Sequence, residues 1–163
     1  MNQGGTFMHE LGHNLGLDHG GYYALEDSRT NLKPNYLSVM NYLFMFSGIP
    51  TAASPGSIVP VSYRLDYQDI DPSGSILPDL DENNLSEPDG ISSGTNDITY
   101  YACPARTAAP GSGPIDWNCD GNSGSTGVVA DINMDSAFTR LKSHRDWPYL
   151  QFRFQDNAVT YAN

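Results

Sequence analysis

The stretch from residue 9 to residue 19 constrains this chain most, because it places three histidines and a glutamate at fixed intervals. It reads His-Glu-Leu-Gly-His-Asn-Leu-Gly-Leu-Asp-His, with Glu10 directly after the first histidine. Two helical residues that are four apart lie about 40° from each other around the axis and about 6 Å apart along it. His9 and His13 can therefore reach one metal ion from the same face of a helix.

A turn after this helix would complete the metal site. Gly16 can adopt the positive φ angle that ends a helix, and the reversed chain would return His19 as a third ligand. Three neutral imidazoles leave the fourth tetrahedral position of a Zn²⁺ ion free for water, as in catalytic sites. Glu10 is about 100° around the helix from His9, where its carboxylate can act on that water. The pattern predicts zinc on His9, His13 and His19, with Glu10 as a catalytic residue.

The same segment also has the pattern of an amphipathic helix. Phe7, Leu11 and Leu15 recur every four residues, roughly opposite His9 and His13, so we expect them to pack into a core. The alternative is a buried helix whose histidines are incidental. With average residue usage, the full pattern arises by chance on the order of once in a hundred thousand chains of this length. This rarity favours the metal site.

A second segment extends the pattern into a family resemblance. The motif from His9 to His19, followed by Ser-Val-Met-Asn-Tyr at 38–42, resembles the metzincin zinc metallopeptidases. Metzincins place a methionine in a tight turn beneath the zinc site, and Met40 matches it. Tyr42 matches a tyrosine that some metzincins hold near the zinc, as an extra ligand or a hydrogen-bond donor in the transition state. Ordinary core packing is the alternative for both residues.

The resemblance implies a secreted zinc endopeptidase that acts on protein or peptide substrates. Metzincin catalytic domains carry a further subdomain ahead of the zinc helix, and one of its edge strands pairs with the substrate. Only eight residues precede His9 here, and they show no signal-peptide pattern. We expect residues 1–163 to form a single unit of a larger catalytic domain, completed by a missing N-terminal subdomain or by self-association.

Composition narrows the classes of partner. The chain has 163 residues, with 8 basic and 19 acidic side chains and a formal net charge of −11. Such a surface disfavours nucleic acid, whose phosphates need basic residues, and disfavours anionic membrane surfaces. The chain contains no apolar run of transmembrane length. A protein that is soluble outside the cell, with carboxylates available for Ca²⁺, fits these numbers.

The remaining chain predicts an α+β fold in which one zinc-binding helix is followed by mostly irregular chain and a few short strands. Prolines and small residues predict a polar connection over 20–35 and an irregular loop over 49–61. Alternating apolar residues predict strands over 62–67 and 149–154, and a short helix is expected over 136–145. The acid-rich segment 66–90 is interpreted as a solvated loop, with calcium at Asp79 and Asp81 as the alternative.

A sharper calcium pattern lies downstream. Residues 116–121 read Asp-Trp-Asn-Cys-Asp-Gly, the D-x-N-x-D-G spacing that opens an EF-hand-type loop, and 131–135 repeat D-x-N-x-D. The pair is similar to the calcium loops of dockerin and thrombospondin type 3 modules. The glutamate that an EF-hand needs at position twelve is absent, since Gly127 stands there. We predict one structural Ca²⁺ on Asp116, Asn118 and Asp120, with Asp131 as an additional candidate ligand.

The two cysteines, Cys103 and Cys119, predict a disulfide rather than a redox or zinc-thiolate site, because neither belongs to a C-x-x-C pair. In the chain-entropy model a loop of this size is stabilised by about 3 kcal/mol. The intervening residues 104–118 are rich in proline and glycine, so we expect little regular structure there. The disulfide and the calcium pattern together mark 103–135 as a stiffened region.

A function of another class fits the same features. The chain could be a non-catalytic extracellular protein, structural or self-assembling, that keeps a zinc site for stability and is stiffened by calcium and the disulfide. The complete ligand set with Glu10 favours the enzyme, because structural zinc sites close their fourth position with a protein ligand.

Overall fold

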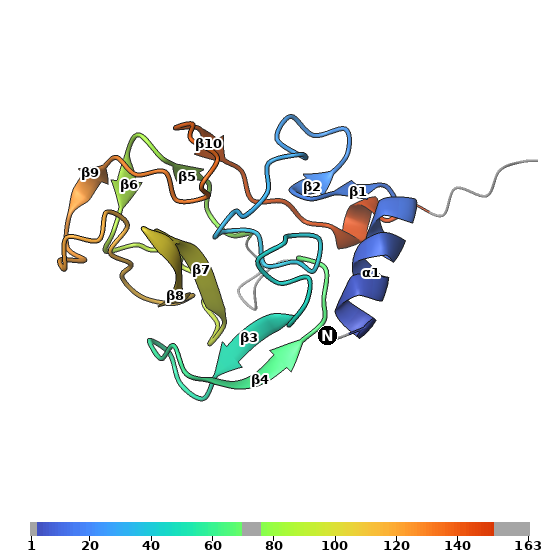
Figure 1. Ribbon diagram of the computed structural model, residues 1–163, viewed down its shortest axis with the longest axis horizontal. Helices are drawn as coiled ribbons and strands as arrows, with labels where there is room; N and C mark the ends of the chain where they lie inside the picture. Colours follow the sequence, from blue (N-terminus) through green and yellow to red (C-terminus); the bar gives the residue numbers. More distant parts are fainter. Residues whose placement is uncertain (1–2, 70–75, 152–163) are drawn as a thin grey trace, which may run out of the picture.

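The structure is a computed structural model that describes residues 3–69 and 76–151 (Figure 1). These residues form a small mixed α/β protein with a single α-helix and short strands. The elements, in chain order, are α1 (Gln3–Asn14), β1 (Leu17–Asp18), β2 (Gly21–Tyr22), β3 (Ile49–Ala52), β4 (Pro60–Arg64), β5 (Leu80–Asp81), β6 (Leu85–Ser86), β7 (Ile98–Cys103), β8 (Ala105–Pro110), β9 (Thr126–Val128), β10 (Arg140–Leu141) and the 3₁₀ helix η1 (Trp147–Tyr149).

The described strands pair as five separate two-stranded antiparallel sheets: β1–β2, β3–β4, β5–β10, β6–β9 and β7–β8. The β7–β8 hairpin is the longest and runs in register from Ile98 opposite Pro110 to Cys103 opposite Ala105. An isolated bridge between Thr51 and Asp97 joins β3 to the start of β7. The pairs β5–β10 and β6–β9 join distant segments, so the last third of the chain returns over the acid-rich segment (Figure 1).

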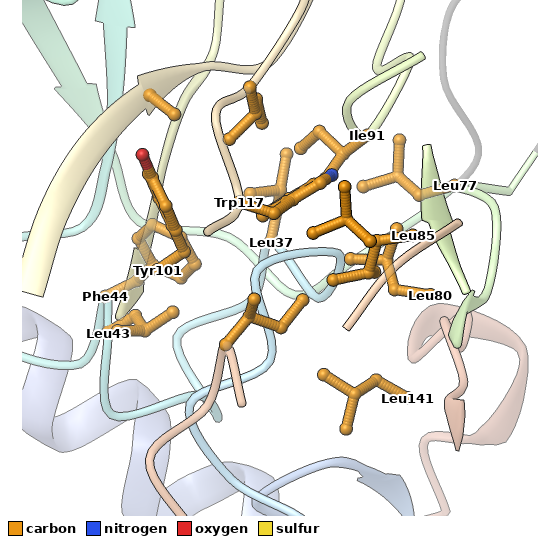
Figure 2. Close-up of a cluster of buried hydrophobic side chains, with 14 of the residues drawn as sticks. Leu37, Leu43, Phe44, Leu77, Leu80, Leu85, Ile91, Tyr101, Trp117 and Leu141 are labelled. Carbon is orange, nitrogen blue, oxygen red and sulfur yellow. The ribbon is translucent and has the colours of Figure 1, made fainter. Parts of the chain in front are cut away.

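A main core holds these small sheets together (Figure 2). Trp117 lies within it, almost fully buried, with its ring centroid 5.3 Å from that of Tyr101 and its indole N–H donating to the Ser86 carbonyl. Sheets this short cannot be stable alone, so burial of this cluster supplies most of the stabilisation. Its buried members are Leu37, Leu43, Phe44, Ile49, Leu77, Leu80, Leu85, Ile91, Tyr101, Ala109, Ile115, Trp117, Val128, Ile132 and Leu141.

The zinc-motif helix α1 packs on a second apolar cluster, formed by Leu17, Tyr36, Val39, Met40 and Tyr67. We predicted that Phe7 and Leu11 would face the core, and this is wrong, because they are 68% and 37% exposed. The buried residues of α1 are instead Gly5, His9 and Gly12. The helix approaches its support through glycines, which lets its backbone lie closer than leucines on that face would permit.

Gly12 offers a test of this close approach. A Cβ atom there would overlap the sulfur of the fully buried Met40 and would lie 3.1 Å from a ring carbon of Tyr67. Gly12→Ala gains about 1 kcal/mol of helix propensity, but overpacking costs about 1–3 kcal/mol. We expect a net loss in the free energy of unfolding, measured in urea. Leu11→Ala is the control on the half-exposed face and should change it by about 0.5 kcal/mol or less. A stabilised Gly12→Ala would contradict the close packing.

Three local predictions are corrected by the strands. Segment 49–61 contains β3 and the start of β4 on either side of an irregular stretch at 53–59, because Pro50 and Pro60 sit in a two-stranded sheet where a missing N–H is tolerated. The predicted strand 62–67 is β4, which begins earlier and ends at Arg64. Segment 136–145 contains β10 in place of a helix, because Leu141 pairs with Leu80.

The disulfide between Cys103 and Cys119 is confirmed. The loop inside it is more regular than expected, because β8 pairs along the whole of β7. Half of the strand predicted over 149–154, residues 152–154, lies outside the described residues, and Tyr149 belongs to η1. Within the described residues, no helix is long and apolar enough to span a membrane.

Candidate metal centre

Three histidines converge at the C-terminal half of α1. His9 and His13 lie on the helix, which ends at Asn14, and Gly16 then takes a φ angle of 95°, as predicted. The chain continues through β1, and His19 lies in the turn between β1 and β2. One ligand atom from each of the three rings lies within 4.8 Å of the others. The sequence prediction that these three side chains can hold one metal ion is confirmed.

The hydrogen bonds of the two helical histidines show what the centre requires. The Nδ1 atoms of His9 and His13 each lie 2.9 Å from a backbone carbonyl oxygen, of Val39 and Leu17 respectively. Carbonyl oxygens only accept, so both Nδ1 atoms carry a proton, which leaves the two Nε2 atoms to present lone pairs. These Nε2 atoms lie 3.1 Å apart. Two lone pairs that face each other repel, and a cation bound between them removes the repulsion.

The 3.1 Å distance between the Nε2 atoms of His9 and His13 is close to that expected around a first-row metal ion. Two nitrogens bound at about 2.0–2.1 Å in a tetrahedral site lie roughly 3.4 Å apart. Burial, followed by the neighbouring rings of His13 and His9, lowers the pKa of His19. This lowered pKa favours the neutral form of the His19 ring, which is the form that binds metals.

The other predicted residues surround this triad. The Tyr42 ring centroid lies 4.5 Å from that of His19 and 5.5 Å from that of His9, and the side chain is partly exposed. Met40 is fully buried beneath Gly12. Glu10 is exposed on α1 next to His9, and its charge acts on His19 by raising the pKa of that ring against the effect of burial. The catalytic roles of Glu10 and Tyr42 stay predictions.

A buried charged cluster, which the sequence did not reveal, lies behind the third ligand. The side chain of Lys33 is fully buried, and its ammonium donates to the Gly20 carbonyl at 2.8 Å, the Lys142 carbonyl at 2.7 Å and the Asp27 carboxylate at 3.0 Å. Asp27 also contacts His144 Nε2. Lys33 was assigned to a polar connection, and its partners near residue 142 are too distant in sequence to be inferred.

The loop of the predicted calcium site and the repeat of its pattern that opens at Asp131 share one backbone conformation. Positions four and six of each have positive φ: Cys119 and Gly121 in the first, Met134 and Ser136 in the second. In each loop the first aspartate accepts a hydrogen bond from the amide of the sixth residue. Asp131 therefore opens a loop of its own, although it lines the same surface hollow as Asn118.

Two glutamates anchor these loops, and the sequence analysis missed both. Glu87 accepts from the amides of Trp117 and Ser125, and Glu82 accepts from those of Ile132 and Thr139. Both glutamates are fully buried, although their segment was interpreted as a solvated loop. The amides that satisfy them come from the calcium-pattern loops, so only the tertiary structure explains their burial.

No protein-family model, curated protein or solved structure matches this chain. Its function must therefore be inferred from the chemistry of the three-histidine centre. The convergence of two bare Nε2 atoms at 3.1 Å is the observation that carries most weight.

Proposed function

We propose that this chain is the zinc-binding part of a secreted, metzincin-like zinc endopeptidase that hydrolyses protein or peptide substrates. The proposal is supported by His9, His13 and His19, whose ligand atoms lie within 4.8 Å of one another, and by Glu10 beside them. Zinc is favoured because a three-imidazole set with an open fourth position is typical of catalytic zinc. The Cys103–Cys119 disulfide supports an oxidising, extracellular location.

The proposed chemistry assigns a role to each side chain. When bound, Zn²⁺ supplies polarisation of the scissile carbonyl and a water whose pKa falls towards about 7. His9 and His13 present Nε2 to the ion, because backbone carbonyls hold their Nδ1 protons. Glu10 takes the proton of the attacking water and later passes it to the departing amine. Tyr42 would donate a hydrogen bond to the oxygen on which negative charge develops.

The test is cleavage of a mixed quenched-peptide library by the zinc-loaded chain, beside the chelated chain and the chain reloaded with zinc. Cleavage that disappears with chelation and returns with zinc supports the proposal. Zinc binding without cleavage removes the peptidase activity of this chain and favours a structural zinc site. Failure to bind zinc, measured by competition with a chromogenic chelator, would contradict both.

We also propose that Asp116, Asn118 and Asp120 bind one structural Ca²⁺. The ion would cross-link carboxylates that now repel one another, so it should raise the thermal midpoint. Calcium should bind in a calorimetric titration of the zinc-loaded chain, and Asp116→Asn should weaken that binding at least ten-fold. Glu26→Gln, at an exposed carboxylate that pairs with Lys142, is the control and should leave calcium binding unchanged. The hypothesis is contradicted if calcium produces neither binding heat nor a shift in the thermal midpoint.

A non-catalytic, self-assembling extracellular protein is the second candidate. It is favoured by the exposed apolar side chains along β4 and the residues before it, Ile58, Val59, Val61 and Tyr63. Such a cluster on one strand is typical of an association surface. Light scattering coupled to size-exclusion chromatography separates the two candidates, because assembly through β4 should be reduced by Val61→Lys.

A further inference from the structure

We propose that Asp146 is a positioning residue for the metal ligand His9, acting through the segment Tyr36–Met40. Asp146 lies more than a hundred residues after this segment and just before η1. The inference depends on the proposed metal site and not on peptidase activity.

The first step is the hydrogen bond that orients His9. Its Nδ1 donates to the Val39 carbonyl at 2.9 Å, and the ring is almost fully buried. A metal-bound histidine is held in the correct tautomer and orientation by the partner of its second nitrogen, and loss of such a partner costs about 10–100-fold in metal affinity. The position of the Val39 carbonyl therefore decides where Nε2 of His9 points.

The second step is the set of bonds that holds Val39 in place. The Val39 amide donates to the Asp66 carbonyl at 2.8 Å, which fixes one side of the residue. On the other side, the Ser38 hydroxyl donates to Asp146 Oδ2 and the Tyr36 hydroxyl donates to Asp146 Oδ1, both at 2.7 Å. The carboxylate of Asp146 thus bridges two residues immediately ahead of the carbonyl that His9 uses.

The same carboxylate ties the turn to the next segment. Asp146 Oδ2 also accepts the Gln68 amide at 2.9 Å, and the Asp146 amide donates back to the Gln68 carbonyl at 2.8 Å. Burial raises the pKa of Asp146 to about 6, although the bonds from Ser38, Tyr36 and Gln68 oppose this. At neutral pH the side chain is ionised, and hydrogen bonds to a charged acceptor are roughly twice as strong as neutral ones.

The carboxylate of Asp146 is not needed to fill space. Asp146 is fully buried, and Tyr36, which donates to it, belongs to the apolar cluster under α1. Burying an ion costs several kcal/mol even with the charges of His144 and Lys33 acting on it, whereas an apolar side chain would fill the volume without that cost. What the carboxylate adds is three directed bonds, two to the turn that carries the His9 acceptor and one that ties this turn to Gln68.

The test compares zinc affinity in Asp146→Ala and Asp146→Asn, measured by chelator competition, with the visible spectrum of the Co²⁺-loaded chain as a report of ligand geometry. We expect Asp146→Ala to weaken zinc binding about 10–100-fold and to change the cobalt spectrum. Asp146→Asn should recover most of the affinity, because the hydroxyls of Tyr36 and Ser38 can reverse their hydrogen bonds and donate or accept.

The matched control is Glu82→Ala, which removes another fully buried carboxylate that holds backbone amides but belongs to the second calcium-pattern loop. It should lower stability and leave zinc affinity within about two-fold. Equal effects of Asp146→Ala and Glu82→Ala on zinc affinity, or no effect of either, would overturn the proposal.

If Asp146→Ala does not fold, Ser38→Ala removes one bond of the bridge and should weaken zinc binding several-fold. An unchanged zinc affinity in Ser38→Ala would overturn the proposal as well.

Failure of the unaltered chain to bind zinc would refute the metal site itself.

Discussion

Replacing Glu10 by alanine is expected to lower kcat/KM for peptide cleavage by about 10²–10⁴-fold, the usual contribution of a general base, while zinc still binds. Glu10 follows His9 on α1, its side chain is exposed, and its charge is felt at the His19 ring. In the proposed mechanism it is the group that accepts the proton of the attacking water. The measurement is the rate of quenched-peptide cleavage, beside zinc affinity by chelator competition.

Asp18→Asn is the matched control for this prediction. Asp18 directly precedes His19 and also acts on the charge of that ring, but its carboxylate is turned to Arg29, with Oδ2 3.6 Å from Nε. Removing this charge should change kcat/KM by less than about three-fold if Glu10 acts by proton transfer and not through the electrostatic field of its negative charge. Full activity in Glu10→Ala, or equal losses in both variants, would contradict the assigned role.

The parts of this centre that the sequence predicted are those that depend on local geometry. Helical spacing fixes His9 and His13 on one face, and a single glycine turn returns His19, so no distant contact is needed to infer the cluster. The Cys103–Cys119 pair was predictable for a similar reason, since these are the only cysteines. The direction in which α1 packs was not, because Gly5 and Gly12 leave no hydrophobic pattern to identify their face.

Contacts between segments far apart in sequence explain the remaining errors. Asp146 reaches Tyr36 and Ser38 across more than a hundred residues, and its burial has no local signal. Glu82 and Glu87 looked like solvated acids because their partners are backbone amides of distant loops. Patterns of residue type reveal which faces are apolar, but they do not reveal which amide will satisfy a buried carboxylate.

The ion pair between the buried Lys33 and the partly buried Asp27 is expected to show the largest effect on stability. Lys33→Met should lower the free energy of unfolding by about 3–5 kcal/mol, because it leaves the partly buried Asp27 carboxylate with one donor fewer. The Lys33 ammonium also holds the Gly20 carbonyl, directly after the ligand His19. The measurement is the urea midpoint at pH 7 of the chelated chain, which keeps metal binding out of the comparison.

Lys142→Met is the control for this variant. Its ammonium pairs with Glu26 at the surface, and exposed ion pairs contribute about 0–1 kcal/mol. Its side chain is partly exposed. A loss of stability comparable with that of Lys33→Met would therefore contradict the larger contribution predicted for the pair of Lys33 and Asp27. If Lys33→Met lowers the free energy of unfolding by less than about 1 kcal/mol, the packing of methionine compensates for the lost charge.

The same pair predicts how stability depends on acid. Burial by itself would raise the pKa of Asp27, but the His144 hydrogen bond and the Lys33 charge hold it well below the ordinary value. In the unfolded chain this carboxyl takes up its proton near pH 4, whereas the folded chain resists protonation, so its stabilisation is full above pH 4 and is lost as pH falls further. Asp27→Asn should therefore be less stable at pH 7 and should lose less stability than the unaltered chain between pH 4 and pH 3. Parallel urea midpoints across that interval would mean that Asp27 gains nothing from its partners in the folded state.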